Sequence, residues 1–173
     1  MSRAGLLVAA FVLASSAGQG AGRREVGTAS FHVGAMSCVS CEKAIRANLS
    51  RMKSVDVVLA SAAAKRVQLR FDVEKVSMQE ILATIAGKAG TYEARLALKY
   101  ADPQISPARA EKAQLALARV PGVRAASLPD EKGVILLTFR SQPAAFLPAI
   151  LKAAAHAGTP LVDPADAPTK SNN

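Results

Sequence analysis

The sequence predicts an α+β protein, because segments with strand periodicity and segments with helix periodicity alternate along it. Residues 28–34 and 67–71 alternate apolar and polar side chains, which is typical of half-buried strands. After the first strand, apolar side chains recur at helical spacing at Cys41, Ile45, Leu49 and Met52. The full order, strand, helix, strand, strand, helix, strand, predicts a ferredoxin-like βαββαβ sandwich with two helices on one face of an antiparallel sheet.

The other elements of this first unit follow from shorter signals. Val55, Val57 and Leu59 predict the second strand, and residues 92–100 contain the last one. Ser77 and Glu80 form a capping box, which marks the start of a helix. The apolar face of that helix and the glycines near its end are Met78, Ile81, Leu82, Ile85, Gly87 and Gly90.

The second half of the chain repeats the pattern of the first. Glu42-Lys43-Ala44 recurs as Glu111-Lys112-Ala113, and residues 134–139 match the strand 67–71. A last helix over about 143–157 and a short strand at 160–162 complete a second, degenerate ferredoxin-like repeat. The repeat register places Ile105, Pro107 and Ala110 at the positions of Met36, Cys38 and Cys41, so the two cysteines have no counterpart here. We expect this second unit to pack against the first, to dock a partner or to act as a spacer.

These signals divide the chain into four parts. We expect a signal peptide over residues 1–22, the first folded unit, which contains both cysteines, over 26–99, the degenerate repeat over 100–162 and a disordered tail over 163–173. Residues 91–102 must supply a strand to both units, either as two short strands or as one shared strand. We favour the shared strand.

The first residues have the composition of an export signal. Arg3 precedes the apolar run Ala4–Ala14, and small residues follow, with cleavage expected after Ala17, Gly20 or Gly22. The apolar run is shorter than the roughly 20 residues of a membrane span. We therefore expect a soluble monomer in the periplasm or otherwise exported, without stable membrane insertion, although an uncleaved anchor is the alternative.

The charge of the chain is basic, with a formal net charge of +9. The lysines and arginines are scattered and no aromatic residues interleave with them, which argues against a nucleic-acid surface. A solvated basic face is the simplest interpretation, and attraction to an acidic partner or an anionic membrane surface is the other.

Cys38 and Cys41, the only cysteines, lie where the first strand gives way to the first helix. The positive end of a helix stabilises thiolate over thiol, and thiolates favour soft ions. Redox exchange and an inert disulfide are the alternatives, but so small a loop would add little stability as a structural staple. Cys41 starts the apolar stripe of the helix, so we expect Cys38 to be the more exposed sulfur.

These residues resemble the heavy-metal-associated domain family, which includes copper chaperones and periplasmic mercuric-ion-binding proteins. The Met-x-Cys-x-x-Cys part of the family motif is intact over Met36–Cys41, and Gly34 lies one position earlier than the family glycine. The Ala-Gly-Tyr segment of the family is present as Ala89-Gly90-Thr91-Tyr92, with one insertion. The resemblance covers residues 28–99.

The resemblance implies that Cys38 and Cys41 hold one soft ion, Cu(I) or Hg(II) first and Zn(II) or Cd(II) as alternatives. It implies that Met36 fills the core under the loop, and that Lys88 and Tyr92 lie near the site. The ion would pass by ligand exchange to a membrane transporter or another metal-transfer protein.

We expect no enzymatic activity. The Cys-x-x-Cys spacing also occurs in thioredoxins, but Ser37 precedes the first cysteine and no proline lies between Cys41 and Tyr100. No catalytic triad, phosphate-binding loop or carboxylate pair is visible. A thiol-disulfide exchange protein and a docking or sensor adaptor remain the alternative functions.

Overall fold

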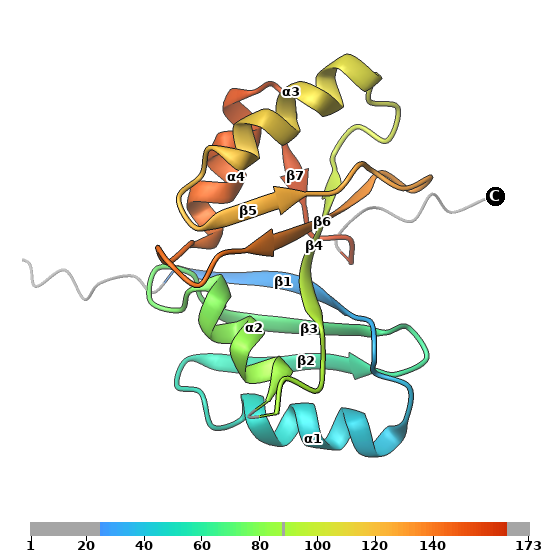
Figure 1. Cartoon of the computed structure of the whole chain (residues 1–173), viewed down its shortest axis with the longest axis vertical. Coiled ribbons are helices and arrows are strands. Elements are labelled where there is room, and N and C mark those ends of the chain that lie inside the picture. Colours follow the sequence, from blue (N-terminus) through green and yellow to red (C-terminus); the bar gives the residue numbers. More distant parts are fainter. Residues whose placement is uncertain (1–24, 88, 166–173) are drawn as a thin grey trace, which may run out of the picture.

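The computed structural model describes residues 25–87 and 89–165, and it is the predicted α+β fold (Figure 1). The predicted signal peptide, residues 1–22, lies outside these residues. The elements, in chain order, are β1 (Val26–Val33), α1 (Val39–Leu49), β2 (Val55–Ser61), β3 (Arg66–Asp72), α2 (Met78–Ala86), β4 (Ala94–Tyr100), α3 (Pro107–Ala118), β5 (Val123–Ala126), β6 (Val134–Phe139), α4 (Leu147–His156) and β7 (Leu161–Val162).

The strands form one antiparallel sheet in the order β2-β3-β1-β4-β6-β5, and β7 also pairs with β4. The first unit, β2-β3-β1-β4, has the strand order of a ferredoxin-like sandwich. The second unit, β7-β4-β6-β5, has the same order when β4 is counted as its first strand. Both units are therefore ferredoxin-like, and the degenerate repeat is present in the fold.

The strand β4 is shared between the two units, as we favoured. One edge of β4 pairs with β6, in a register that joins Leu96 to Leu137. The other edge pairs with β1, which joins Phe31 to Leu96, and then with β7, which joins Lys99 to Val162. The boundary that we predicted between the two units, at residues 99 and 100, thus lies inside β4 and not in a linker.

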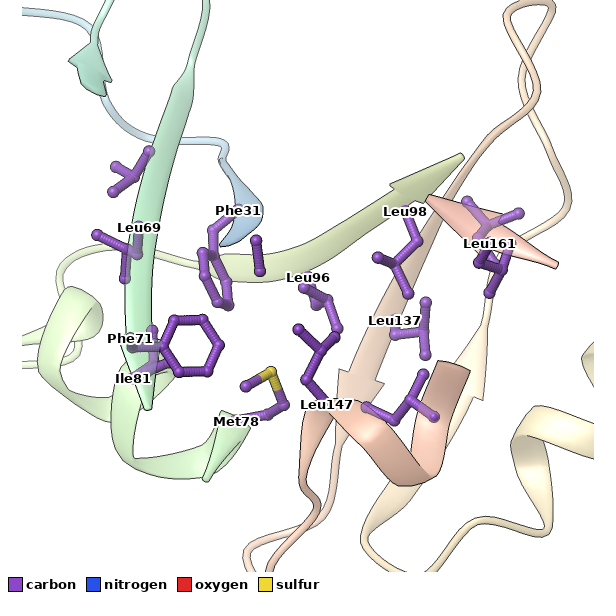
Figure 2. Packing of buried hydrophobic residues seen from close by; sticks show 14 of the residues in the cluster. Phe31, Leu69, Phe71, Met78, Ile81, Leu96, Leu98, Leu137, Leu147 and Leu161 are labelled. Carbon is purple, nitrogen blue, oxygen red and sulfur yellow. The ribbon is translucent and has the colours of Figure 1, made fainter. Parts of the chain in front are cut away.

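A single hydrophobic core lies under the helices. The alternate residues Phe31, Leu69, Leu96 and Leu137 of four neighbouring strands are buried on the same face of the sheet. Figure 2 shows Met78 of α2 and Leu147 of α4 approaching this row from both units. Burial of apolar surface contributes about 25 cal/mol per Å², so one continuous core couples the stability of the units.

The predicted disordered tail begins too early. Asp163 is buried, and its carboxylate accepts a hydrogen bond of 2.9 Å from the hydroxyl of Ser30 on β1. A buried carboxylate needs such a partner because burial removes its hydration. Composition does not reveal this contact, since Ser30 is 133 residues away. Residues 166–173 lie outside the described part of the chain.

The side chain of Gln79 joins α2 to the connection between β6 and α4. Its amide nitrogen donates to the carbonyl oxygens of Pro143 at 2.8 Å and Arg140 at 3.2 Å, and its oxygen accepts from Ala145 N at 2.8 Å. Gly122 lies against the same connection with φ +83°, where a Cβ would come within 2.2 Å of the Pro143 oxygen. Only a glycine fits there without displacing the backbone.

The capping box of α2 is present as predicted. The carboxylate of Glu80 accepts from Ser77 N at 2.8 Å and from the Ser77 hydroxyl at 2.7 Å, and the hydroxyl accepts from Glu80 N. These bonds, the backbone one first, lower the pKa of Glu80 below its ordinary value of 4.5. None of the helices in the described part of the chain has the length and hydropathy that crossing a membrane requires.

We expect Gln79→Ala to lower the free energy of unfolding by about 1–3 kcal/mol, because the buried N–H of Ala145 loses its acceptor. Urea denaturation measures this change. Gln114→Ala is the matched control, since the Gln114 amide donates to an exposed carbonyl of Ser127. Equal losses in the two variants would show that the bonds of Gln79 do not couple the units.

We expect Glu80 to make folding dependent on acid pH. Its folded pKa is lowered, so its contribution is complete above pH 4.5 and is lost as the pH falls through the folded pKa. In Glu80→Gln, stability should therefore fall less between about pH 6 and pH 3 than in the natural chain. Glu131→Gln, at an exposed position, is the control and should leave the natural pH dependence intact.

Candidate metal centre

The cysteine loop leaves the central strand of the first unit and is held by both of its neighbours. Val33, the last residue of β1, donates from its backbone N–H to Lys65 O at 2.8 Å, in the β2–β3 turn. Gly34 N donates to Glu93 O at 3.1 Å, just before β4. The start of the loop is therefore held between the β2–β3 turn and the α2–β4 connection.

Met36 lies beneath the loop. Its side chain is fully buried in the core cluster, and its N–H donates to Val33 O at 3.2 Å. A flexible thioether fills the irregular space under a loop well. The burial agrees with the role as a core plug that the family resemblance implies.

Cys38 is the N-cap of α1, with an extended backbone at φ −144° and ψ 156°. Its sulfur accepts a hydrogen bond from Cys41 N at 3.3 Å, where a serine or aspartate oxygen usually caps a helix. The free N–H groups and dipole of the first turn favour negative charge on this sulfur. Cys38 is exposed and Cys41 is half-buried against the core, as the helical stripe predicts.

The two sulfurs are joined in a disulfide, with their Cα atoms 5.2 Å apart. This is the oxidised form of the pair, in which neither sulfur has a thiolate to offer a metal. After reduction, two bonds of about 2.3 Å to one ion need sulfurs at most about 4.6 Å apart. Side chains on Cα atoms at this separation reach that spacing by rotation about χ1, so the reduced pair fits one soft ion.

Two nearby polar side chains were not singled out from the sequence. The hydroxyl of Ser40 lies 3.0 Å from the Cys38 sulfur. The carboxylate of Glu42 accepts a short hydrogen bond from Ala62 N, which holds the β2–β3 turn against α1. The sequence shows a serine inside the motif and an acidic residue in the first turn of the helix. It does not show which groups these two side chains contact.

Of the other two residues predicted near the site, Tyr92 and Lys88, the structure describes only Tyr92. Tyr92 is half-buried and packs against the core cluster. Lys88 lies outside the described residues. No group of three or more His, Cys, Asp or Glu side chains in residues 25–87 and 89–165 is arranged to hold a metal ion.

The matching position of the second unit has no comparable chemistry. Pro107 opens α3, Ala110 is buried and Ile105 packs against the core. Ser106 is the N-cap of α3, but its hydroxyl makes no capping hydrogen bond. The second unit thus keeps the fold of the first while its loop carries no thiol.

Comparisons with known proteins find one family model and several solved structures. The model of the heavy-metal-associated domain family matches residues 30–91. The water-soluble region of the P-type ATPase CopA from Bacillus subtilis is 18% identical, with 87% of this chain and 98% of that chain covered and a TM-score of 0.41. The N-terminal soluble domains of B. subtilis CopA are 17% identical, with 85% and 99% covered and a TM-score of 0.40.

A candidate copper-ion-binding protein from Bacillus anthracis is 24% identical and covers 42% of this chain and 99% of its own, with a TM-score of 0.37. No curated protein matches the chain. The family match spans β1 from Ser30, the cysteine loop, both helices of the first unit and the segment before β4. Residues 30–91 therefore match the heavy-metal-associated domain family, and this match covers less than half of the chain.

Proposed function

We propose that this protein captures one soft heavy-metal ion, Cu(I) or Hg(II), on Cys38 and Cys41 and passes it to a membrane transporter by ligand exchange. The observation that carries the proposal is the unequal pair of sulfurs at the start of α1, one exposed and one half-buried. Two thiolates suit soft ions, and Zn(II) and Cd(II) remain alternatives. The role is that of a carrier and not of a catalyst.

The proposed transfer follows from the positions of the two sulfurs. An incoming thiolate on the partner would bind the ion as a third ligand, since the described residues around the pair supply only two. Cys38 would then leave first, because its side chain is exposed and lies on the loop. Cys41, packed against the core, would leave last and keep the ion bound until the partner holds it.

An export signal would put the chain in the periplasm, where dithiols tend to oxidise. The Cys38–Cys41 disulfide then competes with metal binding, so a reductant or a strongly thiophilic ion is needed. The same bond favours one other candidate function, thiol-disulfide exchange with a partner. The two functions differ in whether the reduced chain binds metal tightly.

We expect the reduced chain without residues 1–22 to bind one Cu(I) or one Hg(II) ion. Metal titration against a competing chelator gives the affinity, and native mass spectrometry gives the stoichiometry and identifies the ion. Binding should be lost in the Cys38→Ser/Cys41→Ser double variant and kept in Ser37→Ala, which changes the exposed residue before Cys38. A reduced and folded chain that binds none of the four ions would overturn the carrier function and leave thiol-disulfide exchange.

We also expect Cys38 to be the faster-reacting thiol. Because Cys38 is exposed and Cys41 is half-buried, iodoacetamide should modify Cys38 of the reduced chain at least about tenfold faster. Peptide mass spectrometry after timed quenching assigns each site, and the single Cys→Ser variants give each rate separately. Equal rates would contradict the proposed order of ligand release.

A further inference from the structure

The two helices of the second unit form a surface groove, which is separate from the cysteine pair of the first unit. The groove lies between α3 and α4 and has a volume of about 310 Å³. Lys112, Leu115 and Arg119 line it from the side of α3, and Ala153, His156 and Ala157 line it from the side of α4. Its floor is mainly apolar, and its rim carries basic side chains.

Leu115 is the apolar anchor of this groove. Its side chain is 58% exposed, while Ala110, Ala113 and Leu117 hold the buried face of the same helix against the core. Nothing in the described part of the chain covers Leu115. The side chain of Leu115 is not needed to pack α3 against the core. It is therefore available as an apolar contact for a partner.

The positive charges of the groove are unpaired. Lys112 and Arg119 are exposed, and neither forms an ion pair within the described residues, whose four ion pairs lie elsewhere. His156 lies on the other side of the groove, at the end of α4. A ligand with carboxylates flanking an apolar side chain would match both the charges and the floor.

The first unit has the same groove without the apolar anchor. Asn48, Arg51, Ala83, Thr84 and Gly87 line a hollow of about 330 Å³ at the corresponding place between α1 and α2. With a one-residue slip after the Glu-Lys-Ala match, Leu117 and Arg119 align with Leu49 and Arg51, and Leu115 then aligns with Ala47. The arginine is thus common to both units, whereas the exposed leucine belongs to the second unit alone.

We propose that the groove between α3 and α4 docks an acidic amphipathic segment of a partner protein. An apolar side chain of the segment would lie over Leu115 and the alanines of α4, and its carboxylates would meet Lys112 and Arg119. A concave site with a single leucine fits a peptide side chain, whereas attachment to a bilayer needs a protruding cluster of large apolar residues. This docking does not depend on metal binding by the cysteine pair.

The test uses a fluorescent synthetic helix of about 14 residues, with leucines on one face and glutamates on the other. Its affinity for the chain without residues 1–22 is measured by fluorescence anisotropy at low and physiological salt. We expect Arg119→Glu and Leu115→Gln each to weaken binding at least about tenfold. Arg51→Glu, the same charge reversal in the matching groove, should change the affinity by less than about twofold.

Other outcomes would overturn the docking site. Equal weakening by Arg51→Glu and Arg119→Glu would show attraction to net charge alone, and insensitivity to all three variants would place the peptide elsewhere. Absence of binding up to about 1 mM peptide would exclude an acidic helix as the ligand. Sedimentation with vesicles of phosphatidylcholine and phosphatidylglycerol that depends on Leu115, without peptide binding, would assign the surface to a membrane. Metal titration of Arg119→Glu separates this site from the cysteine pair.

Discussion

The sharing of β4 between the two units is the constraint on which the rest of the structure depends. A strand has only two edges that can pair, and β6 occupies one of them along residues 96–99. The other edge must serve both β1 and β7, which therefore meet end to end, with Asp163 hydrogen-bonded to Ser30 at the junction. The chain is a tandem repeat in sequence but one sheet with one core in space.

The position of the cysteine pair follows from this arrangement. β1 lies between β3 and β4, so both of its edges are paired and its end is held firmly. The loop that continues from it is supported from below by the buried side chain of Met36 and closed by the first turn of α1. The N-terminus of a helix favours the ionised form of a thiol, and the thiolate is the form that binds a soft ion.

The second unit shows what remains of such a module when its ligands are absent. Packing is retained, because Ala110, Ala113 and Leu117 still bury the inner face of α3. The outer face of α3 carries the exposed side chain of Leu115 and the basic side chains of Lys112 and Arg119. The proposed docking would use this outer face, while the second unit also supplies β6 and β7 as neighbours of β4.

The sequence alone determined the order of the elements, the capping box of α2 and the unequal exposure of Cys38 and Cys41, because each depends on residues that are close in the chain. Strand alternation, helical spacing and the N-cap position are local properties. The contacts of Asp163 with Ser30, of Gln79 with residues 140–145 and of Glu42 with Ala62 were decided only by the tertiary structure. These contacts join a side chain to a side-chain or backbone group 20 to 133 residues away, and pairing across a sheet or between units leaves no periodic signal in either segment.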